Sequence, residues 1–361
     1  MIFNKRKHKD HNLPIKWGNT TLEIKDNWKY LGVTLNRLTS PLNHIKKIKN
    51  IIANKQTTLI NHLASKRMNS LNIHIKLFNS LVRSAYMYAA PAWMWKNPDL
   101  IESIQTQYFR RIFLLPFKTP SYIIQAELGL QPMIFTLIKS TFQFWKKLAT
   151  KKAPYYAWKE LKYWLLHPNN KDNPWKLFFQ KIKIPPSLTH ITMEKWKTEQ
   201  IELAKEYTIT LLSEEQTSNL RIKALHSWYH PHYNSITNIS NNPQPYLQQP
   251  WPWAIKRLIF QLRTDPNDIY LCSVQIILDS AKPCHLCNQA NQTIDHLLLN
   301  CCTIQQKFKY PPRLPITNLN HSPLQEILKN PTEQQIWYIR NILKLIILTV
   351  YSEEEETSSS N

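Results

Sequence analysis

The amino-acid sequence predicts a mainly α-helical protein with a short N-terminal β-hairpin and a small metal-binding module near its C-terminus. Three observations lead to this prediction. Apolar residues recur at helical spacing over residues 41–150, β-type residues gather before residue 38, and four Cys and His residues stand close together between residues 284 and 301. With 361 residues, 43% of them hydrophobic, the chain can bury one large core or two to three smaller ones.

The first 38 residues are expected to be extended. Residues 20–24 (TTLEI) and 29–35 (KYLGVTL) contain β-type side chains in partial alternation. We predict two strands here, with a hairpin as one arrangement.

A basic amphipathic helix is predicted next. Ser40 suits the N-cap and Pro41 the first helical position. Apolar residues then recur near the helical period, and lysines occupy the other faces. The apolar positions are Leu42, Ile45, Ile48, Ile52 and Leu59, and the lysines are Lys46, Lys47, Lys49 and Lys55.

Further helices are expected through residue 150. Apolar residues at steps of three and four predict a helix over residues 69–87, and another from Asp99, with Glu102 at capping-box spacing. A short helix starts at residues 119–120 and can end at Gly129 in the left-handed conformation. Pro132 then opens a longer helix. These stripes indicate a small bundle, because amphipathic periodicity mainly reports burial.

The pattern weakens after residue 150. Residues 235–250 are rich in Asn, Gln, Pro and Ser, which favours a linker. Residues 336–351 form the most apolar run, but Arg340 and Lys344 interrupt it and it is too short to cross a bilayer, so we predict a packed terminal helix. The predicted segments are 1–38, 39–150, 151–250, 251–351 and a solvated, disordered acidic tail at 352–361.

The most specific motif is a C-x2-C-x8-H-x4-C array formed by Cys284, Cys287, His296 and Cys301. Such spacing can close a tetrahedral structural zinc site from one short segment. The alternative is a set of reduced core cysteines beside an incidental histidine. Cys302 competes with Cys301 as the fourth ligand, and Cys272 is interpreted as a buried thiol.

Charge indicates the class of partner. Lys and Arg total 46 against 24 Asp and Glu, giving a net charge of +22. A polyanion, and nucleic acid in particular, is the expected partner, because aromatic residues are interleaved with the basic ones. No small-molecule substrate and no membrane are expected. The N-terminus has no apolar secretory core, so the chain is not expected to be secreted.

Several enzyme classes are excluded. The chain has only three glycines, Gly18, Gly32 and Gly129, which excludes a glycine-rich phosphate loop. It also has no G-x-S-x-G elbow, no H-E-x-x-H helix and no adjacent Asp pair that could gather two magnesium ions.

Several segments, taken in order, resemble the C-terminal half of a LINE-type (non-LTR, jockey-like) retrotransposon reverse transcriptase. Residues 28–35 (WKYLGVTL) with His44-Ile45, residues 88–93 and residues 104–112 (IQTQYFRRI) are similar to the segments that lead into and form the family's thumb. The similarity continues through Pro116, residues 119–120 and residues 127–129 (ELG), then residues 261–264 (QLRT), the Cys284 array and residues 296–301 (HLLLNC).

This resemblance implies a function. The β-strands would be a remnant of the palm, the bundle a thumb, and the array a CCHC zinc knuckle, which together grip template RNA, primer DNA and their hybrid. The family's catalytic, Mg-binding aspartates would precede Met1, and Asp26, Asp99 and Asp172 lie on separate segments, so this chain is expected to be inactive as an RNA-directed DNA polymerase. It would act in a ribonucleoprotein of the nucleus and cytoplasm.

The expected nucleic-acid contacts are basic side chains of these segments, with aromatic side chains stacking on unpaired bases. They are Lys46, Lys49, Lys55, Arg110, Arg111 and Arg263. One departure from the family is Asp265-Pro266, where Gly-His usually follows Leu-Arg-Thr, which affects any phosphate contact there.

Two other functions remain open. A host-retained, non-catalytic DNA- or RNA-binding protein with a structural zinc would have the same features. A zinc-dependent hydrolase is weaker, because it needs an open coordination position and a general base, whereas four Cys and His ligands close the shell.

Overall fold

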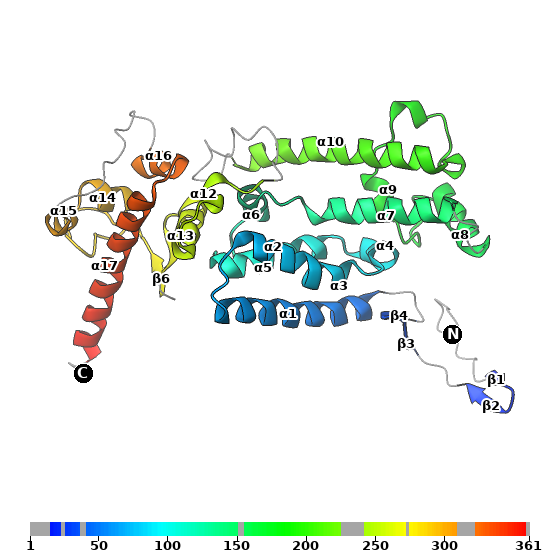
Figure 1. Cartoon of the computed structure of the whole chain (residues 1–361), viewed down its shortest axis with the longest axis horizontal. Helices are drawn as coiled ribbons and strands as arrows, with labels where there is room; N and C mark the ends of the chain where they lie inside the picture. The colour runs from blue at the N-terminus through cyan, green and yellow to red at the C-terminus, as the bar shows by residue number, and fades with distance from the viewer. Residues whose placement is uncertain are drawn as a thin grey trace. The chain divides into compact units, whose positions relative to one another are not determined.

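The computed structural model describes residues 15–22, 26–36, 41–150, 155–224, 242–271, 274–308 and 322–358. Helices dominate these residues, and the named strands form three two-stranded antiparallel hairpins (Figure 1). The predicted mainly α-helical fold is confirmed. Among the described residues, no helix combines the length and apolar character that spanning a bilayer requires.

The chain divides into two compact units, and neither is continuous in sequence. The first unit holds Met1–Ile101 and Met133–Leu211, and the second holds Glu102–Pro132 and Leu212–Asn361. This division differs from the five consecutive segments predicted from the sequence, because folding brings together residues that lie far apart in the chain.

Two hairpins open the first unit: β1 (Ile15–Trp17) pairs with β2 (Thr20–Leu22), and β3 (Asn27–Tyr30) pairs with β4 (Val33–Asn36). Leu31 and Gly32 join β3 to β4, with φ angles of 44° and 85°. A two-residue turn of this kind needs left-handed backbone, which glycine adopts freely. The prediction that residues 29–35 form one strand is therefore wrong, because the chain reverses at Leu31-Gly32.

Helix α1 (Leu42–Ser65) is the predicted basic helix. Its N-cap is Pro41, and the predicted cap Ser40 lies outside the described residues. Buried His44 connects α1 to β4, because its Nδ1 accepts a hydrogen bond from the Thr34 N–H at 3.2 Å. The His44 ring also meets the ring of Trp93 edge to face, with 4.6 Å between centroids. Burial, aided by the nearby charge of Lys47, lowers the pKa of His44.

The helix predicted over residues 69–87 is present, but a wider turn interrupts it. Helix α2 (Leu71–Leu77) continues into a π-helical segment, η1 (Phe78–Arg83), and then into α3 (Ser84–Met87). Phe78 and Val82 of η1 are both buried. The remaining elements of the unit are α4 (Ala90–Trp93), η2 (Met94–Lys96), α7 (Met133–Thr150), α8 (Tyr155–Leu166), α9 (Lys176–Lys181), η3 (Pro186–Leu188), η4 (Met193–Lys195) and the first half of α10 (Thr198–Ala224).

Aromatic rings form the core of the first unit. Trp95, Trp145 and Phe178 are almost completely buried, and the rings of Trp145 and Phe178 lie 5.0 Å apart. The Trp95 Nε1–H donates to Thr141 Oγ1 at 2.9 Å, so its polar atom is satisfied inside the core. Helix α7 confirms the long helix predicted after Pro132, whereas α10 was not predicted.

The second unit begins with α5 (Asp99–Phe113), most of which belongs to it, and α6 (Ser121–Leu128). Gly129 ends α6 with a φ of 62°, as predicted. A Cβ atom at Gly129 would lie 2.3 Å from the carbonyl carbon of Asn242. Glycine is therefore required here both by the left-handed backbone and by this close approach.

The prediction of a linker at residues 235–250 is wrong for its second half. Residues 242–250 include α12 (Pro245–Gln248), and Tyr246 and Leu247 are buried. The Gln244 N–H donates to the carbonyl of Glu127 at 2.9 Å. These residues pack against α6, although their composition is typical of an exposed segment. Residues 235–241 lie outside the described residues.

The C-terminal elements complete the second unit. They are α13 (Trp253–Thr264), β5 (Asp268–Leu271), β6 (Val274–Ile277), α14 (Ile294–Leu299), α15 (Cys302–Lys307), α16 (Pro323–Lys329) and α17 (Glu333–Ser358). Buried Ile339, Ile342 and Leu343 confirm that the apolar run packs as a helix. The predicted disordered tail is wrong as far as Ser358, because α17 continues to that residue.

Candidate metal centre and basic surface

Cys284, Cys287, His296 and Cys301 form a cluster whose four ligand atoms all lie within 4.8 Å of one another. Ligands about 2.0 to 2.3 Å from a tetrahedral zinc ion are separated by roughly 3.3 to 3.8 Å. The cluster is thus close enough to hold a metal ion, and only small adjustments would bring its atoms to bonding distance. This is the group that the sequence spacing predicted.

A tight turn presents the first two cysteines. The Cys284 N–H donates to the Ala290 carbonyl at 2.7 Å, and the Asn288 N–H donates to the Cys284 carbonyl at 2.8 Å. Asn288 has a φ of 54°, which lets the chain reverse directly after Cys287. A bridge between Pro283 and Asn291 closes the base of the turn.

The other two ligands lie on a short helix and just after it. Thr293 caps α14, because its side chain accepts a hydrogen bond from the His296 N–H at 3.1 Å. His296 therefore lies in the first turn of α14. The Cys301 N–H donates to the carbonyl of His296 at 2.9 Å, which holds Cys301 beside His296 at the N-cap of α15.

Contacts among the ligands and their surroundings hold the cluster together. Cys287 Sγ and His296 Nε2 are 3.3 Å apart. The Thr303 hydroxyl donates to the Leu286 carbonyl at 2.8 Å, which ties α15 to the cysteine turn. Leu297 and Ile304 are each 1% exposed and form an apolar base. The site is supported by a small core of its own.

The structure places Cys301, rather than Cys302, among the four ligands. Cys301 is buried, whereas Cys302 is half-buried and its Sγ lies 3.6 Å from Gln289 Oε1. Cys272 lies outside the described residues.

The surroundings of Cys287 and Cys301 shift their pKa values in opposite directions. Burial raises the pKa of Cys301 to about 11, and the neighbouring cysteines add to this effect. Burial also acts to raise the pKa of Cys287, but hydrogen bonds from the backbone of Gln289 and Ala290 and from the neighbouring thiols lower it below its ordinary value. A bound cation would favour the thiolate at both positions.

Helix α1 carries the predicted basic surface. Lys46, Lys49 and Lys55 are all exposed. At about 100° per residue, Lys46 lies about 120° from the stripe of buried isoleucines, while Lys49 and Lys55 lie about 60° from it on opposite sides. Lys55 Nζ also donates to the Leu81 carbonyl at 3.3 Å. The three lysines are therefore exposed to solvent, but they do not lie in a single row along the helix.

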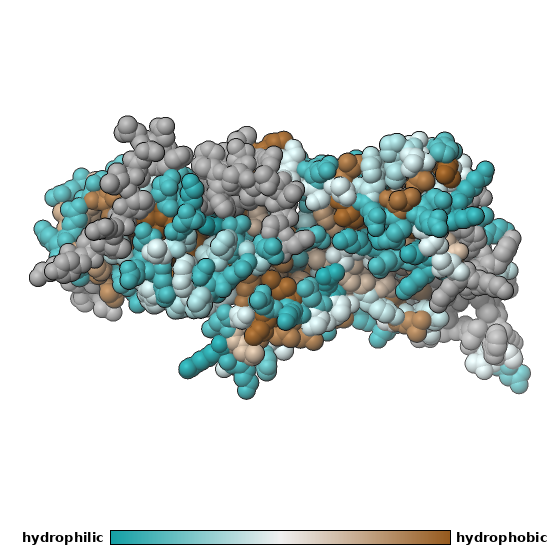
Figure 2. All heavy atoms as spheres, turned by 45° about the horizontal axis from the view of Figure 1, so that its top comes forward, coloured by the Kyte–Doolittle hydropathy of each residue, from teal (hydrophilic) through white to brown (hydrophobic). Residues whose placement is uncertain are grey.

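The stretch of sequence that contains α1 has no acidic residues. No Asp or Glu occurs between Asp26 and Asp99. On the face drawn in Figure 2, hydrophilic side chains cover much of the described surface, with smaller hydrophobic areas between them. The positive charge of α1 is thus not neutralised by acidic residues of its own segment.

The three predicted arginines have different environments. Arg111 is exposed. Arg110 is half-buried, and its Nη2 donates to the Thr119 carbonyl at 2.7 Å. Arg263 is only 2% exposed and forms an ion pair with Glu127, with Nη1 3.2 Å from Oε1. The prediction that Arg263 contacts nucleic acid is wrong, because its guanidinium is enclosed and holds the interior of the unit together.

Sequence reasoning missed Glu127, the partner of Arg263. Glu127 is fully buried and also accepts a hydrogen bond from the Tyr246 hydroxyl at 2.8 Å. Its place in the predicted short helix gave no sign of this, because most glutamates on helices are exposed.

Comparison of the chain with protein families, with curated proteins and with solved structures finds no match.

Proposed function

We propose that this chain is the nucleic-acid-binding C-terminal part of a non-LTR retrotransposon reverse transcriptase. In this role it grips template RNA and primer DNA, and a structural zinc ion stabilises its C-terminal module. The ordered resemblance of residues 28–301 to the family supports the proposal. Its net charge of +22 also favours a polyanionic partner.

The observation that carries the proposal is the exposed basic surface of α1. Ile45, Ile48 and Ile52 anchor the helix in the core, which leaves Lys46 and Lys49 on solvent in a segment with no acidic residue. Lysines held in this way can neutralise backbone phosphates without disturbing the core, and binding of this kind depends on shape and charge rather than on base sequence.

Zinc is the metal that suits the cluster best. Three thiolates and one imidazole form a soft donor set, which favours zinc over magnesium or calcium. Cys284, Cys287, His296 and Cys301 would fill all four positions of a tetrahedron, so the ion would stabilise the fold of the module and leave no position for a reacting water. This argues against the hydrolase.

The chain itself is proposed to have no polymerase activity. Two-metal phosphoryl transfer needs carboxylates that converge on both ions. In the described residues, the Cys and His cluster is the one group of three or more potential ligands close enough to hold a metal. A primer-extension assay with purified protein, a homopolymer template and magnesium tests this point, and metal-dependent extension would contradict it.

The test of binding uses purified full-length chain and three ligands of equal length: an RNA–DNA hybrid, a DNA duplex and single-stranded RNA. We expect binding to all three with a steep decrease in affinity as salt increases. An affinity that is absent, or independent of salt, would contradict nucleic-acid binding.

A host-retained regulator with the same fold is the second candidate. Its natural ligand would be a specific DNA or RNA site, so competition with unrelated sequences would lower its binding little. The proposed retroelement fragment would be displaced by any sequence of similar length and structure.

A further inference from the structure

The loop after α5 holds a single phenyl ring in solvent. Phe117 is 87% exposed. A single exposed apolar side chain is common on protein surfaces and does not by itself indicate a function. Two features decide whether this position is incidental: how firmly the loop is fixed, and what surrounds the ring.

The loop is fixed at its start by the end of α5. The Leu115 N–H donates to the Arg110 carbonyl at 2.9 Å and the Leu114 N–H to the Arg111 carbonyl at 3.4 Å. This pair of bonds is the Schellman arrangement, in which glycine usually occupies the left-handed position. Leu114 occupies it here with a φ of 55°. A leucine keeps this unfavourable conformation only where the surrounding structure imposes it.

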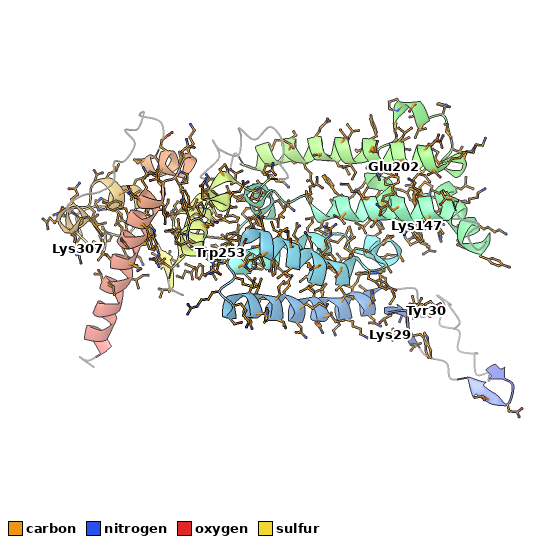
Figure 3. All side chains as sticks on the ribbon, viewed as in Figure 1. Lys29, Tyr30, Lys147, Glu202, Trp253 and Lys307 are labelled. Carbon is orange, nitrogen blue, oxygen red and sulfur yellow. The ribbon has the colours of Figure 1, made fainter. Side chains whose placement is uncertain are left out.

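Side chains from α13 satisfy the last carbonyls of α5. Arg257 Nε donates to the Ile112 carbonyl at 2.7 Å, and Gln261 Nε2 donates to the Phe113 carbonyl at 3.0 Å. The rings of Phe113 and Trp253 lie 4.9 Å apart, and Figure 3 labels Trp253 where α13 begins. The base of the loop is thus attached to a second helix by both polar and apolar contacts.

The turn that carries Phe117 is fixed as well. The Thr119 N–H donates to the Pro116 carbonyl at 3.0 Å, and Arg110 Nη2 donates to the Thr119 carbonyl at 2.7 Å. Lys118 Nζ lies 3.1 Å from Asp265 Oδ2 and 3.2 Å from Asp268 Oδ2. The residues on both sides of Phe117 are therefore held, while its ring projects into water.

Positive charge lies beside the ring. The Arg110 guanidinium is 5.7 Å from the centroid of Phe117, within the range of a cation–π interaction, and Arg111 is exposed on the preceding turn of α5. The two aspartates of this region are paired with Lys118. The ring provides a stacking surface for a base, and the exposed Arg111 on the last turn of α5 provides a cation for a phosphate.

We infer that Phe117 is a stacking platform for an unpaired base of a bound nucleic acid, with Arg111 on the adjacent phosphate. This inference rests on the proposed nucleic-acid binding and names the part of the ligand that this loop takes, a single-stranded segment. Because the backbone on both sides of the ring is fixed, the ring loses little conformational entropy when a base stacks on it. Binding through this ring therefore costs less entropy than binding through a side chain on a flexible loop.

The test measures binding of the full-length chain to a single-stranded oligonucleotide and to a blunt duplex of the same sequence. Phe117→Ala should weaken single-strand binding about tenfold, the usual effect of removing one stacking partner. Duplex affinity and the salt dependence of both ligands should change little, because no charge is lost and the stacked pairs inside a duplex expose no face. Phe117→Trp should retain binding, and its added fluorescence should be quenched by the single strand. Phe117→Leu should resemble the alanine variant.

Ile277→Ala is the matched control, because Ile277 is a 65% exposed apolar residue of the same unit. It should leave both affinities unchanged. If wild-type protein binds nucleic acid and Phe117→Ala binds single strands equally well, the inference is wrong while the proposed function stands. If wild-type protein binds no nucleic acid, the proposed function fails, and the inference fails with it. Loss of binding to anionic lipid vesicles in Phe117→Ala, with single-strand binding unchanged, would assign the ring to a membrane surface instead.

Discussion

Arg263 and Glu127 form a buried ion pair across 136 positions of the sequence. Arg263 Nη1 lies 3.2 Å from both carboxylate oxygens of Glu127, and the two side chains are 3% and 0% exposed. The Tyr246 hydroxyl also donates to Glu127, and Arg263 Nη2 donates to the Leu328 carbonyl. This one polar group connects α6, α12, α13 and α16.

Replacing one member of this pair should strongly destabilise the second unit. Arg263→Met leaves a buried carboxylate without its cation, and we expect a loss of about 3–5 kcal/mol in the free energy of unfolding. The double variant Glu127→Leu/Arg263→Met should recover much of this loss, because it removes the unpaired charge. Urea unfolding of the wild type, the two single variants Glu127→Leu and Arg263→Met, and the double variant measures the coupling energy between the two side chains. Additive losses from the two single variants would contradict it.

Gly129→Ala should destabilise the protein by more than about 2 kcal/mol, because the new methyl group meets the backbone of Asn242 in addition to the cost of the left-handed conformation. Gly18→Ala is the matched control, since Gly18 has a similar φ of 58° and no atom within 4 Å of the added Cβ. It should cost only about 1–2 kcal/mol, the cost of the left-handed conformation alone. Equal shifts in thermal unfolding for the two variants would mean that the collision with Asn242 has no effect.

Cys301→Ser should abolish stoichiometric zinc binding, whereas Cys302→Ser should retain it, because of these two neighbouring cysteines only Cys301 is one of the four ligands. Metal analysis of protein purified under reducing conditions distinguishes the two. Chelation of the metal should unfold residues around the site and leave the first unit folded, since the apolar base of the module is small. Hydrogen exchange maps this effect. Full zinc content in Cys301→Ser would show that another group, such as Cys302, can complete the site.

Lys46→Glu/Lys49→Glu should weaken binding to an RNA–DNA hybrid and reduce the slope of log affinity against log salt by about two units, one per lost phosphate contact. Lys171→Glu/Lys195→Glu changes the net charge equally at two other exposed lysines of the same unit. Equal effects in the two double variants would indicate a response to net charge alone and would remove α1 from the proposed path. Circular dichroism checks that helix content is preserved.

Acid should weaken the contact between α1 and β4. Burial lowers the pKa of His44 from 6.5 in the folded protein, so the unfolded chain binds the proton more tightly and stability is lost as the pH falls below about 6.5. Protonation would also convert Nδ1 from an acceptor into a donor facing the Thr34 N–H. We expect His44→Asn to show a smaller decrease in melting temperature between pH 7.5 and 5.5 than the wild type. The same decrease in both would assign the acid sensitivity to other histidines.

The sequence by itself determined the elements whose signals are local. Isoleucines at helical spacing placed α1, Gly129 placed the end of α6, and the spacing of two Cys, a His and a third Cys identified the metal cluster, because all four ligands come from one short segment. It also distinguished helix from strand for most of the first 150 residues. Its errors within that range were also local: the turn at Leu31-Gly32 was interpreted as a continuous strand.

The tertiary structure alone decided which residues from distant segments meet. It enclosed Arg263 with Glu127, although a basic residue in a motif suggested a surface contact, and it buried Tyr246 in a segment whose composition is typical of a linker. It also fixed the loop that exposes Phe117 by means of side chains from α13. These outcomes depend on long-range packing, in which the desolvation of one group is offset by a partner more than 100 residues away, and no local pattern encodes that pairing.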